Sequence, residues 1–183
     1  MIDFSKPVRF RGIHAAYAQY LCTERGTKRV GGVNVFSRVM DVYMIAILVG
    51  LKYSRTAPLD NSEVMMSDIF GNSKEFSGKK ISSSDINSET VHANQTILNH
   101  IYRVVMLTED TRSLTDEEKI ANAFKSENDS DKLEANLELL NAYARGGLEI
   151  LYERFQGLAS DEDSILAAQL TLFDDFYQDE IEY

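Results

Sequence analysis

A chain of 183 residues, 44% of them apolar and 26% charged, is long enough to form one domain with an ordinary core. Its nine Phe and nine Tyr residues argue against a disordered chain, and a single cysteine, Cys22, excludes an internal disulfide. The net charge of −10 is uneven: residues 1–60 hold nine Lys and Arg against four Asp and Glu, residues 109–183 six against twenty. We expect one helical domain over 1–183, with a basic front (1–60) and an acidic back (109–183).

Two features indicate where the protein works. The longest uninterrupted apolar run, Val42 to Leu51, has ten residues, whereas a membrane-spanning helix needs about twenty. The first residues lack the apolar core of a signal peptide, and the unpaired Cys22 favours a reducing compartment. The expected location is the cytoplasm, with no membrane contact.

The first 60 residues predict two helices separated by a glycine-rich break. Apolar spacings of three and four predict a helix over about 12–24, and three glycines end it within 25–32. A second helix, over about 34–54, is apolar on nearly every side and should therefore lie at the centre of the fold. Asp41 would be costly if buried alone, so we expect a buried structural pair with Arg38, three residues earlier.

The middle of the chain is polar and gives the weakest signal. Residues 59–85 form a long loop or arm, with a short helix or hairpin around its apolar island as the alternative to a mobile contact segment. A helix follows over about 87–107, and Thr115 with Glu118 forms a capping box that starts another. No run alternates well enough to predict a sheet.

The strongest helical pattern covers about 131–156, and a last helix follows Ser160. The fold class is therefore all-α, an irregular bundle of five or six helices around the central helix at about 34–54. Gly146 and Gly147 interrupt the strongest helix at a cost of about 2 kcal/mol relative to alanine. They indicate either close packing against a neighbouring helix or a face on which a partner docks.

The sequence contains no motif that predicts a catalytic residue, a metal site or a cofactor. The closest pair among His14, His92 and His100 is eight residues apart, which does not fit a zinc-protease helix. The loop over 25–32 has glycines and cations but not the order of a phosphate-binding loop. Whether the chain is an enzyme is left open, and a non-enzymatic role is favoured.

The uneven charge supports three functional hypotheses. The preferred one is a non-enzymatic accessory or adaptor protein that docks on a larger partner or forms a homo-oligomer, with a bacterial nucleic-acid-processing or defence complex as the assembly to examine first. Direct nucleic-acid binding by the basic half is the alternative, and an acidic DNA mimic or inhibitor is the third. The candidate nucleic-acid contacts are Arg9, Arg11, Arg25, Lys28, Arg29 and Arg55. The candidate docking residues are Gly146, Gly147, Asp174, Asp175 and Asp179.

Overall fold

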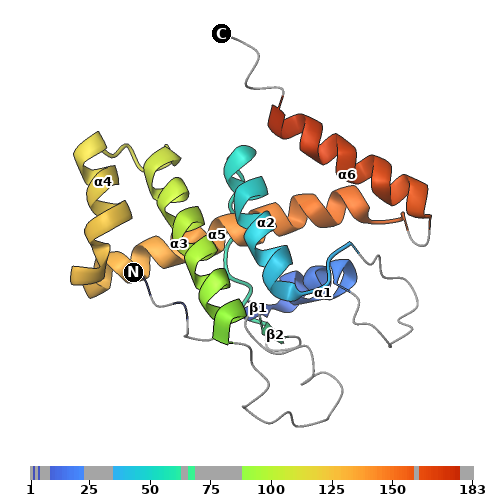
Figure 1. Cartoon of the computed structure of the whole chain (residues 1–183), viewed down its shortest axis with the longest axis horizontal. Helices are drawn as coiled ribbons and strands as arrows, with labels where there is room; N and C mark the ends of the chain where they lie inside the picture. Colours follow the sequence, from blue (N-terminus) through green and yellow to red (C-terminus); the bar gives the residue numbers. More distant parts are fainter. Residues whose placement is uncertain are drawn as a thin grey trace.

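In a computed structural model, the chain forms a bundle of helices around one long helix (Figure 1). The structure describes residues 2, 4, 9–22, 35–62, 66–68, 88–158 and 161–177. These ranges contain six α-helices: α1 (Gly12–Leu21), α2 (Val39–Lys52), α3 (Ser88–Thr108), α4 (Asp116–Lys125), α5 (Ser130–Phe155) and α6 (Glu162–Tyr177). They also contain the 3₁₀ turn η3 (Ser126–Asn128) and the strands β1 (Arg9–Arg11) and β2 (Met66–Asp68). The predicted all-α bundle is confirmed.

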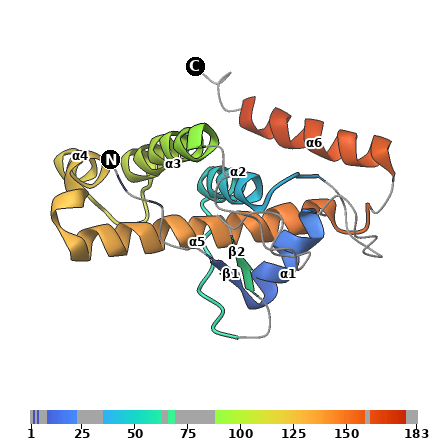
Figure 2. The same cartoon turned by 60° about the horizontal axis from the view of Figure 1, so that its bottom comes forward.

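Helix α5 runs the length of the molecule, and α1, α2, α3 and α4 lie along it (Figures 1 and 2). Its predicted apolar stripe is buried from Leu140 to Phe155. Helix α2 makes the most extensive of the described helix contacts, and that contact is with α5. The predicted central helix therefore shares the centre with α5. It is not enclosed on all sides, since Ile45 on its outer edge is exposed.

At its closest points, the contact between α2 and α5 brings backbone against backbone. A Cβ atom added at Gly147 would overlap the carbonyl oxygen of Ala46, and one added at Gly50 would overlap that of Tyr143. Only glycine lets the two helices approach this closely. We call Gly50, Gly146 and Gly147, with the carbonyls of α2, α5 and the loop after α2 that they meet, the glycine seam.

The two short strands differ from the sequence-based prediction. β1 and β2 pair antiparallel, with Phe10 opposite Ser67, so the loop expected over 59–85 includes one strand of a two-stranded ladder. Three-residue strands are too short to show alternation, which is why the sequence predicted no sheet. Met66–Asp68 belongs to the apolar island where a short element was one alternative, and most of 59–85 lies outside the described residues.

Local capping occurs where the sequence predicts it. The Thr115 side chain accepts a hydrogen bond from the Glu118 backbone N–H, and the Glu118 carboxylate accepts one from the Thr115 backbone N–H. Helix α1 begins differently, because Asp60 caps it from the loop after α2 by accepting a hydrogen bond from Ile13 N–H at 2.9 Å. Gly12 has a φ of +52°, and a Cβ there would overlap Asp60. Residue 12 must therefore be glycine for this cap to form.

A buried polar network joins the end of α3 to α5. The Glu109 carboxylate, 1% exposed, accepts hydrogen bonds from Thr111 Oγ1 at 2.7 Å and from Arg112 Nε at 2.6 Å. Arg112 in turn donates to Asn136 Oδ1 on α5 at 2.8 Å. Asn136 donates to the Tyr102 hydroxyl on α3. A satisfied network of this kind fixes the relative position of the helices it connects.

Candidate functional site

The described candidate nucleic-acid contacts differ in their environments. Arg9 and Arg11 are exposed on β1. Arg55 instead donates hydrogen bonds to two carboxylates of α5, Glu149 at 2.9 Å and Glu153 at 2.9 Å. Two acids therefore neutralise its charge before any phosphate could. The other three predicted contacts, Arg25, Lys28 and Arg29, lie outside the described residues.

Arg38 and Asp41 form the predicted pair, but the pair is not buried. Arg38 donates to both carboxylate oxygens of Asp41, at 2.9 Å from Nε and 2.5 Å from Nη2. The side chains remain 46% and 27% exposed. The prediction of burial is wrong because α2 begins at Val39, which places Asp41 in its first turn, at the surface. A carboxylate there also complements the positive end of the helix dipole.

Gly146 and Gly147 do not form a docking face for another protein. Both are buried in the glycine seam, where Gly146 lies against the backbone of Arg55 and Thr56 and Gly147 against Ala46. The two glycines therefore pack closely against α2 and the loop after it, which agrees with the other interpretation of this pair. The docking assignment for these two residues is corrected.

The acidic residues of α6 have different environments. Asp175 accepts hydrogen bonds from Arg154 Nη2 of α5 at 2.7 Å and from the Tyr53 hydroxyl at 2.5 Å. These bonds from Tyr53 and Arg154 lower the pKa of Asp175. It therefore anchors α6 to α5 and to the end of α2. Asp174 is exposed, and Asp179 lies outside the described residues.

Helix α6 lies at one end of the molecule (Figure 2). It presents an apolar face to solvent. Leu166, Leu170, Phe173 and Tyr177 are 53%, 55%, 61% and 64% exposed. Their spacing of 4, 3 and 4 places them along one side of the helix. We call these four residues the α6 stripe.

The opposite side of α6 faces the body of the protein. Leu172 is buried, and Ile165, Ala168 and Phe176 are partly buried against the core. The helix thus has two apolar sides, of which the bundle covers one. The sequence shows that α6 is rich in apolar residues, but it does not show which of them the body covers. Large exposed apolar patches on soluble proteins mark interaction sites.

Replacing Asp175 tests how α6 is attached. In Asp175→Asn the charge pairing with Arg154 is lost, so α6 should detach from α5 more often, and its amide hydrogens should exchange faster than those of α5. Asp174→Asn removes the same charge from an exposed neighbour and is the matched control. Equal exchange rates for α6 in the two variants would contradict this role of Asp175.

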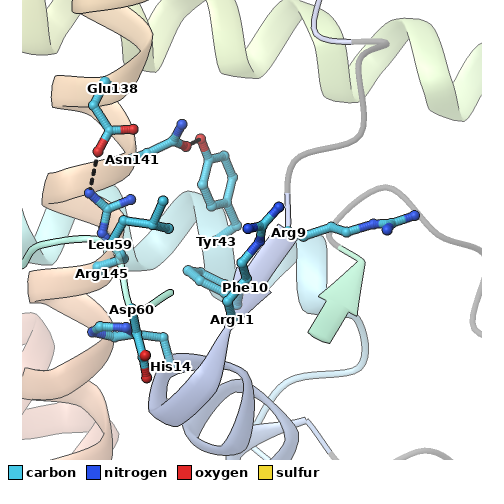
Figure 3. A pocket seen from close by; sticks show the side chains of 10 residues that line it. All are labelled: Arg9, Phe10, Arg11, His14, Tyr43, Leu59, Asp60, Glu138, Asn141 and Arg145. Carbon is cyan, nitrogen blue, oxygen red and sulfur yellow. Dashed lines mark hydrogen bonds and ion pairs between the residues drawn. The ribbon is translucent and has the colours of Figure 1, made fainter. Parts of the chain in front are cut away.

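A pocket of about 380 Å³ lies on a different part of the molecule, between β1, α1, α2, α5 and the loop that follows α2 (Figure 3). Its α5 wall carries Arg145, which donates to Glu138 at 2.6 Å and to the carbonyl of Ala57 at 2.8 Å. Asn141 accepts a hydrogen bond from the Tyr43 hydroxyl at 2.7 Å. Burial raises the pKa of Tyr43 and keeps this hydroxyl protonated, although the nearby Arg145 charge acts in the other direction.

His14 at the start of α1 also lines this pocket and is 3% exposed. Its Nε2 atom lies 3.1 Å from Glu149 Oε1. Its Nδ1 atom is buried and has no hydrogen-bond partner among the described residues. In the sequence, His14 stood out only as a possible metal ligand, and the pocket could not be recognised because its lining residues come from separate segments of the chain.

No group of His, Cys, Asp and Glu side chains suited to hold a metal ion occurs within the described ranges. Over the same ranges, no helix has both the length and the apolar character needed to cross a bilayer. No protein-family model, curated protein or solved structure matches this chain. The α6 stripe and the pocket are therefore the two candidate functional sites.

Proposed function

We propose that this protein is a non-enzymatic adaptor that docks on a larger protein partner through the α6 stripe. The observation that supports the proposal is the exposure of four large apolar side chains on one side of a single helix. Full burial of such a side chain contributes about 1.5–3 kcal/mol, so covering the exposed half of each contributes about 1 kcal/mol. Together they supply enough apolar area for the centre of a protein interface.

The charges around the stripe favour a basic partner over a second copy of this chain. Helix α6 contains four carboxylates, Glu162, Asp163, Asp174 and Asp175, and no Lys or Arg. Two α6 helices packed against each other would bring like charges together, which disfavours a dimer through this face. A partner with an apolar helix or groove flanked by Lys and Arg complements both the stripe and the carboxylates.

The nucleic-acid hypotheses gain no support from the described residues. Of the three described candidate contacts, Arg55 is neutralised by Glu149 and Glu153, which leaves Arg9 and Arg11 on the short strand β1. The cationic loop that suggested a nucleic-acid-processing or defence assembly spans 25–32, outside the described ranges. The adaptor proposal does not depend on that loop.

Site-specific photo-cross-linking from position 170 tests the proposal in native lysate. We expect a cross-link to an apolar segment flanked by Lys or Arg, and Phe173→Asp should reduce its yield at least tenfold by placing a charge in the apolar contact. Thr171→Asp adds the same charge at an exposed position off the stripe and should leave the yield within about twofold. Cross-links mainly to a second copy of the chain, to acidic segments, or equally reduced in both variants would disprove the proposal.

A further inference from the structure

The pocket in Figure 3 has the size of a small-molecule site, and it is separate from the α6 stripe. Its volume of about 380 Å³ falls within the range of ligand pockets, about 300–1,000 Å³. Most of the side chains that line it are polar or charged, and Phe10, Tyr43 and Leu59 add apolar surface. Such a lining suits a small polar ligand, which the polar groups orient by hydrogen bonds.

One of these polar groups is buried without a partner. The His14 ring is held by Glu149 at Nε2, which leaves Nδ1 with one hydrogen bond to make. In the neutral ring Nδ1 accepts from a hydroxyl, and in the charged ring it donates to an oxygen. A buried polar atom without a partner is costly, so a ligand that offers a hydroxyl or oxygen here gains binding energy.

The charges that line the pocket leave one cation uncompensated. Glu138 is paired with Arg145, and the Asp60 carboxylate caps α1. Arg11 makes no ion pair with a described residue, and no hydrogen bond from its side chain to one. In Figure 3, by contrast, Arg9 extends away from the other lining residues. Arg11 is therefore the guanidinium able to receive an anionic group.

The pocket also contains an uncharged hydrogen-bond donor, the side-chain amide of Asn141. The Asn141 side-chain oxygen accepts a hydrogen bond from the Tyr43 hydroxyl, and its NH₂ group makes no hydrogen bond to a described residue. Amide NH₂ and guanidinium groups are both donors and match the acceptor oxygens of a carboxylate or phosphate.

We propose that this pocket binds a small molecule that carries an oxyanion and a hydroxyl group, such as a phosphate or a hydroxycarboxylate. Arg11 supplies the opposite charge, the Asn141 amide donates to the oxyanion, and His14 Nδ1 makes its missing hydrogen bond to the ligand. The adaptor would then carry a ligand site on a surface separate from its partner-binding helix.

Titration followed by NMR tests the proposal with the full chain. Inorganic phosphate and lactate are added separately while the ring nitrogens of His14 and the side-chain amide of Asn141 are observed. We expect saturable shifts of both groups with at least one of the two anions, and the one that saturates at the lower concentration identifies the preferred oxyanion. Lactamide, the uncharged analogue of lactate, and sodium chloride at matched ionic strength should produce no saturable shift.

Two matched variants locate the anion. Arg11→Gln removes a charge-assisted hydrogen bond and should raise the dissociation constant of the binding anion at least tenfold. Lys125→Gln removes one positive charge from an exposed position on α4, outside the pocket, and should change it by less than about twofold. Circular dichroism should show that both variants are folded. Linear shifts with both anions, or equal effects of the two variants, would overturn the proposal.

Anion binding in the pocket should not depend on the adaptor function. Phe173→Asp should leave anion binding unchanged, because the pocket includes no residue of α6. Phe173→Asp should thus lose partner cross-linking and retain anion binding. Arg11→Gln should lose anion binding and retain partner cross-linking.

Discussion

Gly147→Ala is expected to lower the free energy of unfolding by about 3 kcal/mol, at the upper end of the cost of overpacking a core. The added methyl group would overlap the Ala46 carbonyl oxygen and lie close to the Gly50 amide nitrogen. Both are backbone atoms of α2, so no side-chain rotation can relieve the overlap and the two helices must separate. The gain of about 1 kcal/mol in helix propensity offsets only part of this cost. Urea denaturation monitored by circular dichroism measures the difference.

Gly157→Ala is the control for this substitution. Gly157 has a φ of +80° and no atom within contact distance of an added Cβ, so its replacement costs only the backbone strain of about 1 kcal/mol. If Gly147→Ala destabilised the protein no more than Gly157→Ala, the α2–α5 packing would be looser than the structure describes.

Glu109→Gln is expected to lower the free energy of unfolding at neutral pH by about 2 kcal/mol, the contribution of a hydrogen bond to a charged group. The amide keeps the shape of the carboxylate but offers a donor where Thr111 and Arg112 both donate. Glu117→Gln, on the exposed first turn of α4, is the matched control and should change the free energy by less than about 0.5 kcal/mol.

The effect of Glu109→Gln should depend on pH. Burial, the largest single influence on Glu109, raises its pKa, but the hydrogen bonds from Thr111 and Arg112 together lower it below the ordinary value of 4.5. The pKa is thus lower in the folded than in the unfolded state, so the carboxylate stabilises the fold above pH 4.5. This stabilisation is lost as the pH falls through the folded-state pKa. The difference between wild type and Glu109→Gln should therefore shrink on acidification, and a constant difference between pH 7 and pH 3 would contradict this explanation.

The features that the sequence predicted correctly are local ones. The Thr115 and Glu118 capping box requires only residues three apart, and the Leu140 to Phe155 stripe requires only the helical period. Arg38 and Asp41 pair for the same reason, but their exposure depends on where α2 begins, which is Val39 and not about residue 34 as predicted.

The features that the sequence did not predict depend on contacts between distant segments. Asp175 is paired with Arg154 and Tyr53, 21 and 122 residues away, so its role as an anchor within the chain could not be distinguished from a role in docking. The pocket likewise combines residues from β1, α1, α2 and α5. For α6, composition reveals two apolar sides, but only the packing of Leu172 shows which one faces inward.

The glycine seam also sets the distance between two walls of the pocket. Tyr43 lies on α2 and Asn141 and Arg145 on α5, so two walls of the pocket belong to the same pair of helices that touch at Gly50 and Gly147. The distance between those walls is thus set by backbone atoms in direct contact where the two helices cross. A methyl group inserted at the crossing would spread both walls at once, altering the fit of any bound molecule without replacing a single atom that touches it.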